Sequence, residues 1–255
     1  MRRTVVARLV AVAAVVVTAG LLSTGPADAV ANGQPATPGT YPFVVKFTMT
    51  DIPRQNGTTY DSACSGALIS PLWVITGGHC FHNANRVPVS GKPVYKTTAT
   101  LGTVNLAASR GETRTIVDVR QSPLNDIALA KLSAPITDIA PLGIAPTAPK
   151  VGESLELAGW GATSSKNAIP GTRLNIGKVA VGSIATGFIG VHGVYPSAAT
   201  SACVYDSGAP YFTPLSATAG RLVSVESYGP DCPHTRLETT ARADVNVKWI
   251  YQQTG

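Results

Sequence analysis

The fold is decided by the stretch SACVYDSGAP, residues 201–210. It places Ser207 between an acid and a glycine, followed by Ala209 and Pro210, which suits a nucleophile on a tight turn. Gly208 can adopt backbone angles that other residues avoid, so the Ser207 hydroxyl can project while neighbouring N–H groups face the same space. Alone, an Asp-Ser-Gly triplet is typical of an ordinary turn, because all three residues favour turns.

Two other segments carry the partners that a nucleophilic serine needs. The segment WVITGGHC, residues 73–80, runs from an apolar strand pattern into His79, and NDIALAKL, residues 125–132, has Asp126 just before a buried-strand pattern. A serine hydroxyl is a weak nucleophile until a base takes its proton, and the base needs an acid to fix its tautomer. His79, Asp126 and Ser207 could supply these three roles.

These motifs resemble, in order along the chain, those of the trypsin/chymotrypsin-like serine protease family. Residues 73–80 look like Trp-Val-x-Thr-Ala-Ala-His-Cys, and residues 125–129 match Asn-Asp-Ile-Ala-Leu. Residues 159–161 match Gly-Trp-Gly, and residues 203–210 are similar to Cys-x-Gly-Asp-Ser-Gly-Gly-Pro. The resemblance covers the chain from residue 30 onward. It implies an all-β fold of two six-stranded antiparallel β-barrels with the site between them and a short C-terminal helix.

The resemblance implies a secreted serine endopeptidase of bacterial type that works through an acyl-enzyme intermediate. Ser207 would attack, His79 would shuttle the proton, and Asp126 would orient His79 and accept a hydrogen bond from Ser227. The backbone N–H groups of Tyr205 and Ser207 would form the oxyanion hole, although the family has glycine where this chain has Tyr205. That departure leaves two alternatives open: a weakly active or inactive member that binds a partner, and an esterase on the same fold.

For the substrate pocket, the resemblance places Ser201 at the floor and Ser227, Tyr228 and Gly229 along one wall. No acid stands at the floor, so a preference for Arg or Lys is not supported there. An ungapped count back from the C-terminal helix puts Glu238 near the far wall. There it would either attract a basic side chain or face solvent.

Residues 1–29 have the pattern of a secretory signal peptide. A basic start precedes an apolar run over residues 9–22, which is short for a membrane span of about 20 residues, and a small-x-small site ends the segment. Cleavage there would make Val30 the new N-terminus, and the resemblance implies that its ammonium group pairs with Asp206 without any pro-segment. We then expect activity to fall above about pH 8, where a free α-amino group loses its proton unless its partner holds it.

The mature chain is expected to be one peptidase domain, residues 30–255, made of an N-terminal barrel (30–135) and a C-terminal barrel with the helix (136–255). Its formal charge falls from +6 to +4 once the signal peptide is removed, and Lys and Arg are scattered along it. This argues against nucleic-acid binding, and no later segment suggests a membrane. We expect a monomer without cofactor or metal that acts on a polypeptide substrate, with protein protease inhibitors as candidate partners.

Four cysteines in an exported protein indicate two disulfides rather than free thiols. Three pairings are open. The pairs Cys64–Cys80 and Cys203–Cys232 close the shortest loops, and on the chain-entropy model each would contribute roughly 3–4 kcal/mol.

The remaining polar residues have simpler interpretations. Asp118 is the nearby rival of Asp126 but lacks a following strand pattern. His82, His192 and His234 match no motif and are expected at the surface. The tail fits a short amphipathic helix over residues 244–251 with Asp244 as N-cap. Strands are expected over residues 41–47, 64–69, 72–76, 94–106, 113–120, 126–132, 155–161, 174–181, 187–194 and 221–229.

Overall fold

The computed structural model describes residues 29–109 and 111–255. The predicted signal peptide lies outside these residues, apart from Ala29. Across the described part of the chain, no helix has both the length and the apolar character needed to span a membrane.

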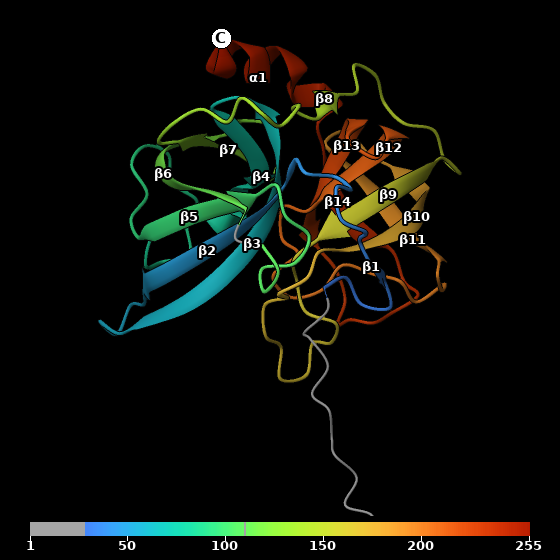
Figure 1. Ribbon diagram of the computed structural model, residues 1–255, viewed down its shortest axis with the longest axis horizontal. Helices are drawn as coiled ribbons and strands as arrows, with labels where there is room; N and C mark the ends of the chain where they lie inside the picture. Colours follow the sequence, from blue (N-terminus) through green and yellow to red (C-terminus); the bar gives the residue numbers. More distant parts are fainter. Residues whose placement is uncertain (1–28, 110) are drawn as a thin grey trace, which may run out of the picture.

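Six antiparallel strands close the first barrel in the order β2-β3-β4-β7-β6-β5. It lies beside the second barrel, with the two connected by the chain around β8 (Figure 1). The strands are β2 (Val44–Pro53), β3 (Thr59–Ser70), β4 (Trp73–Gly77), β5 (Lys96–Leu101), β6 (Glu112–Gln121) and β7 (Ile127–Leu132).

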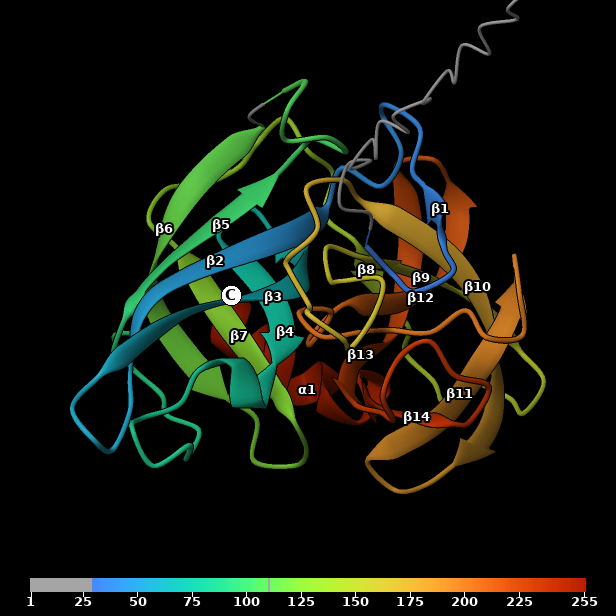
Figure 2. The ribbon, with the colours of Figure 1, turned by 90° about the horizontal axis from the view of Figure 1, so that it is seen from below.

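The second barrel closes because β10 pairs with both β9 and β11, in the order β9-β10-β11-β14-β13-β12. Figure 2 shows the two barrels from below, and β1 pairs antiparallel with β10. Short β8 runs parallel to β13. The elements are β1 (Gln34–Pro35), β8 (Gly143–Ile144), β9 (Ser154–Gly159), β10 (Asn175–Ile184), β11 (Phe188–Tyr195), β12 (Pro210–Ser216), β13 (Ala219–Tyr228) and β14 (Glu238–Arg242).

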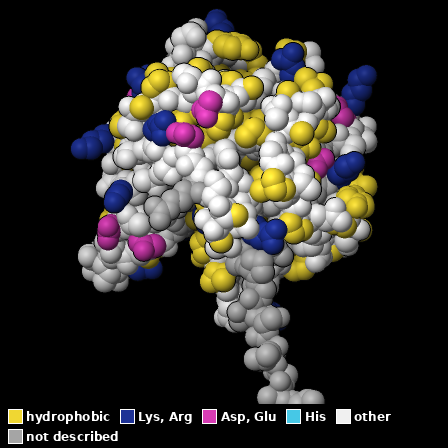
Figure 3. Space-filling model, in the orientation of Figure 1, with side chains coloured by type: hydrophobic (Ala, Val, Ile, Leu, Met, Phe, Trp, Pro, Cys, Tyr) yellow, Lys and Arg dark blue, Asp and Glu magenta, His cyan; other side chains and the backbone are white. Residues whose placement is uncertain are grey.

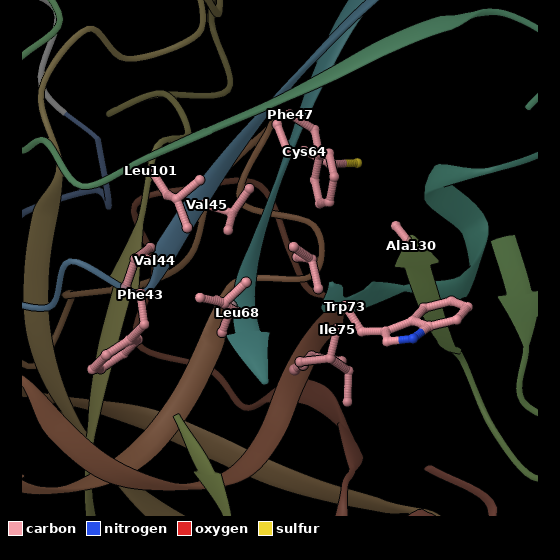
Figure 4. Close-up of a cluster of buried hydrophobic side chains, with 14 of the residues drawn as sticks. Phe43, Val44, Val45, Phe47, Cys64, Leu68, Trp73, Ile75, Leu101 and Ala130 are labelled. Carbon is pink, nitrogen blue, oxygen red and sulfur yellow. The ribbon is translucent and has the colours of Figure 1, made fainter. Parts of the chain in front are cut away.

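A buried apolar cluster fills the first barrel and continues into the junction between the barrels. Figure 4 shows part of it, with side chains such as Phe47 and Leu68 directed into the cluster. Phe212 of β12 meets Tyr41 and Phe43 edge-on, with ring centroids 4.8 and 5.4 Å apart. Edge-to-face pairs of this kind add about 0.5–1.5 kcal/mol beyond area burial. The barrels are therefore joined by packing and not only by the linker.

The predicted fold class is confirmed, with differences in individual strands. The expected strand over residues 94–106 is shorter, ending at Leu101 in β5. Four strands were missed: the two-residue strands β1 and β8, and the barrel strands β12 and β14. Strand β12 carries Pro210 and Pro214, which argue against a strand in sequence, and β14 is only five residues long.

The prediction for the helix cap is wrong. The helix α1 is Val247–Thr254, and Asp244 instead opens a 3₁₀ turn, Asp244–Asn246. Its carboxylate accepts two hydrogen bonds from the Arg242 guanidinium, at 2.7 and 3.0 Å. An ion pair with Arg242, two residues earlier at the end of β14, therefore engages the carboxylate that was expected to cap the helix.

Two histidines expected at the surface are buried. His82 is 6% exposed and packs beside the Tyr95 ring, and the His234 side chain is 7% exposed against Glu238. His192, in β11, is half-buried. On the face drawn in Figure 3, Lys and Arg are dispersed rather than gathered into one patch.

We predict that Phe47→Ala lowers the free energy of unfolding by about 3–5 kcal/mol, because Phe47 is fully buried and truncation leaves a cavity. Val117→Ala on β6 is the control. Val117 is 44% exposed, so its loss should cost less than about 1 kcal/mol. Denaturant unfolding of both variants measures the difference, and equal losses would contradict the assignment of the core.

Candidate active site

Strand register brings His79 and Asp126 together. Strands β4 and β7 pair antiparallel, with Gly77 opposite Ile127. His79 sits in the 3₁₀ turn Gly78–Cys80 directly after β4, and Asp126 directly precedes β7. Both side chains therefore leave the same end of a strand pair that is fixed by the barrel core.

The Asp126 carboxylate holds His79 by two contacts. Its Oδ2 lies 2.7 Å from His79 Nδ1, and its Oδ1 accepts the His79 backbone N–H at 2.8 Å. The Ser227 hydroxyl donates a third hydrogen bond to Oδ2 at 2.5 Å. Burial alone would raise the pKa of Asp126, but the bonds and charge from His79 and the Ser227 hydroxyl outweigh it and leave the pKa below its usual value. The carboxylate is thus ionised and oriented toward the imidazole.

Ser207 reaches the same imidazole from the second barrel. Its Oγ lies 2.8 Å from His79 Nε2, and its carbonyl accepts the Ser65 N–H of β3 at 2.8 Å. The next residue, Gly208, has φ +79°, and a Cβ there would collide with the Thr76 hydroxyl. Only glycine fits this turn, which presses the serine loop against the first barrel.

Tyr205 occupies the left-handed region, with φ 75°. A side chain in this conformation costs about 1–2 kcal/mol, and the Ser65 hydroxyl secures the peptide by donating to the Tyr205 carbonyl at 3.3 Å. The Tyr205 hydroxyl donates to the Ala168 carbonyl at 3.4 Å. Within residues 29–109 and 111–255, the backbone N–H groups of Tyr205 and Ser207 have no recorded acceptor. These donors are free for a bound group.

The Asp206 carboxylate is completely buried beneath the serine loop. Its oxygens accept the N–H groups of Gly161 at 2.7 Å and Cys203 at 3.0 Å, and the Val30 backbone N–H also reaches the carboxylate. A Cβ on Gly159 or Gly161 would collide with it. Burial raises the pKa of Asp206 to about 7, although these hydrogen bonds favour the ionised form. The structure therefore brings together the predicted pair Val30 and Asp206.

A cavity of about 210 Å³ opens beside Ser207. Three residues predicted for the substrate pocket line it, Ser227, Tyr228 and Gly229. The cavity is also lined by Glu226, which sequence reasoning missed because an acid at a strand position gave no motif.

Two other predicted pocket residues lie behind the cavity wall. Ser201 and Glu238 are 1% and 2% exposed and are not among the lining residues. Glu238 accepts the Ala202 backbone N–H at 2.7 Å, which turns its carboxylate toward the protein interior. The open alternative, that Glu238 faces solvent, is therefore wrong.

A second cavity of about 240 Å³ also borders Ser207. It is bordered by His79, Tyr205 and the disulfide Cys64–Cys80. The other disulfide is Cys203–Cys232, so the pairing that closes the shortest loops is the one found. One bridge ties the residue after His79 to β3, and the other ties the serine loop to the segment after β13.

Comparison with known proteins places this site in a family. The Trypsin family model matches residues 30–250. The chain is 31% identical over 169 residues to chymotrypsin-like elastase family member 3B from Macaca mulatta, covering 58% of this chain and 59% of the relative. It is 27% identical over 156 residues to kallikrein-4 from Homo sapiens, covering 56% and 53%. The chain thus spans little more than half the length of these relatives, and as animal proteins they give no support to a bacterial type.

The fold also matches a solved structure. Neuropsin, a serine protease expressed in the limbic system of mouse brain, superposes with a TM-score of 0.69 and 21% identity over 89% of this chain and all of that one. This match supports the two-barrel fold. With a family model that matches well over half of its length, the chain belongs to the trypsin family.

Proposed function

We propose that the protein is a secreted serine endopeptidase. One observation carries the proposal: a continuous line of contacts runs from the Asp126 carboxylate through His79 to the Ser207 hydroxyl, with steps of 2.7 and 2.8 Å. This arrangement of acid, base and nucleophile is the one that activates a serine hydroxyl.

In the proposed reaction, Ser207 Oγ attacks the substrate carbonyl carbon while its proton passes to His79 Nε2. The imidazolium that forms is stabilised by Asp126, which stays ionised. His79 then gives the proton to the leaving amine, and the scissile bond breaks to leave an acyl-enzyme. A water molecule enters, gives its proton to His79 and attacks the ester, and Ser207 recovers its proton as the acid product leaves.

The free N–H groups of Tyr205 and Ser207 are proposed to hold the oxyanion. A tyrosine side chain does not remove the backbone donor, and the left-handed φ of Tyr205 is the conformation that a glycine would adopt there without strain. Each such donor is worth about 10²–10³ in rate.

Val30 and Asp206 are proposed to switch the site on after secretion. The Val30 backbone N–H already reaches the buried Asp206 carboxylate, and the Val30 side chain is buried in the core of the second barrel. A free ammonium group at this point would give Asp206 the counter-charge that its surroundings lack. Removal of residues 1–29 would then complete the site without a separate pro-segment.

The proposal also covers organisation and partners. Polypeptides are the substrates, protein protease inhibitors are candidate partners, and the mature domain over residues 30–255 acts as a monomer outside the cell. Its two barrels divide at residue 135.

We predict that an organophosphate adds once to the mature protein and that the adduct disappears in Ser207→Ala. Intact mass spectrometry measures both, because only an activated serine is phosphorylated. No adduct on a protein whose first residue is Val30 would favour a binding protein instead. If the organophosphate labels the protein but the protein hydrolyses ester substrates and not amide substrates, an esterase would be favoured.

Tyr205→Gly should be about 1 kcal/mol more stable than Tyr205→Ala, because both remove the ring but only glycine relieves the positive φ. Both should keep kcat/KM within about threefold of the wild type, since the N–H donor remains. Denaturant unfolding and peptide hydrolysis test this. A gain of about 10²-fold in Tyr205→Gly would instead show that tyrosine disables the oxyanion hole.

Activity of the protein that begins at Val30 should begin to fall above about pH 8 and be lost as the pH passes the raised pKa of the α-amino group. Pairing with Asp206 raises the pKa of the α-amino group above its unfolded value of about 7.7–8.0, so the stabilisation is complete below that value and fades as pH passes the raised one. A protein retaining Ala29 has an amide there and should lack this transition. The measurement is kcat/KM from pH 6 to 11. N-terminal sequencing of active protein that found Ala31, or a residue well before Val30, would overturn the idea.

A further inference from the structure

Two carboxyl groups are buried together behind the cavity beside Ser207. Glu226 of β13 and Glu238 of β14 are 5% and 2% exposed, and the buried Tyr211 of β12 stands between them. The Tyr211 hydroxyl lies 2.7 Å from Glu226 Oε2 and 2.5 Å from Glu238 Oε2. No Lys or Arg forms an ion pair with either carboxyl anywhere in residues 29–109 and 111–255.

Counting protons shows that the two carboxyls cannot both be ionised in this arrangement. A tyrosine hydroxyl has one hydrogen to donate, yet it contacts two carboxyl oxygens. If both groups were carboxylates, one of these short contacts would place a lone pair of the Tyr211 oxygen against a lone pair of a carboxylate oxygen. With one added proton, Glu226 donates to Tyr211 and Tyr211 donates to Glu238, so both contacts become hydrogen bonds.

The surroundings indicate which carboxyl holds the proton. Glu238 also accepts the Ala202 N–H at 2.7 Å, whereas the Glu226 carboxyl has Tyr211 as its recorded partner. Burial raises the pKa of Glu226 well above its usual value, and the charge of Glu238 adds to this. The neutral acid is therefore Glu226, the member of the pair that also lines the cavity.

The groups that face this pair are almost all acidic. Asp206 and Asp126 both add negative charge near Glu226. His234 is the exception, because its Nε2 lies 3.4 Å from Glu238 Oε1. Asp231, an exposed residue, also lines the cavity, which thus backs onto a cluster that holds more carboxyls than cations.

We propose that this pair makes the cavity select a basic side chain, and that the bound cation releases the shared proton to solvent. The inference rests on the proposed function, since the cavity, which Ser207 lines, would hold a side chain of the substrate. A cation in the cavity favours the doubly ionised pair, so Glu226 gives its proton to water and its carboxylate pairs with the cation. This step strengthens the binding of basic side chains and does not strengthen the binding of uncharged ones, whereas acidic side chains are repelled.

Proton release makes the selectivity depend on pH in a defined direction. The carboxyl pair has a lower pKa with the cation bound than in the free protein. At pH values between these two pKa values, one proton is released for each cation that binds. Affinity for the cation then rises by about tenfold per pH unit in that window. Affinity for an uncharged ligand of the same shape stays constant.

Benzamidine and benzamide test this on the wild-type mature protein, because the two have the same shape and differ in charge. Titration calorimetry from pH 5 to 9, in buffers of different ionisation enthalpy, gives the affinity and the protons released. We expect benzamidine to bind more tightly than benzamide, with release approaching one proton and a difference that grows with pH. In Glu226→Gln, benzamidine should bind without proton release. Glu112→Gln, which removes a partly exposed acid on β6 in the other barrel, should behave as the wild type.

Three results would overturn the proposal. Benzamide could bind as tightly as benzamidine at every pH. Benzamidine could bind without proton release. Release could persist in Glu226→Gln and vanish in His234→Gln, which would assign the proton to the imidazole. None of these readouts requires turnover, so failure here is distinct from failure of organophosphate labelling, which tests the hydrolase itself.

Discussion

The antiparallel pairing of β4 with β7 is the constraint on which the site depends. Because Gly77 lies opposite Ile127, the residues just beyond this pair, His79 and Asp126, leave the barrel at the same point. A register shift by one residue would turn the following side chains to the other face of the sheet. The interior of the first barrel holds this register by packing, so the precision of a polar site is maintained by apolar residues remote from it.

The second barrel adds the nucleophile and has to be held at a fixed distance from the first. Ser65 of β3 achieves much of this, because its N–H binds the Ser207 carbonyl and its hydroxyl binds the Tyr205 carbonyl and accepts the Trp160 N–H. Gly208 lets the chains approach closely enough for these bonds to form. One buried serine, which no sequence motif marked, thus connects the serine loop, the neighbouring barrel and the segment that follows β9.

The sequence predicted the parts of the molecule that depend on residues close together in the chain. His79, Asp126 and Ser207 stand beside short motifs, and the strands around them alternate or run apolar. What it could not predict depends on partners distant in the chain. The sequence left open whether Glu238 attracts a basic side chain or faces solvent, and the pairing of β14 with β11 and β13 buries it. Strand β12 was hidden by its two prolines, although barrel closure accommodates them.

The buried acids show how one barrel divides its negative charge. Asp206 receives backbone N–H groups from Gly161 and Cys203, which favour its ionised form, and it stands ready for an ammonium group. In the described structure the Glu226 carboxyl receives no backbone N–H and faces other acids, so it keeps a proton. Burial raises the pKa of both carboxyls, but backbone donors limit the rise at Asp206 to about 7, whereas the pKa of Glu226 rises well above its usual value. The same barrel can therefore use one acid to organise the serine loop and another to read the charge of what enters the cavity.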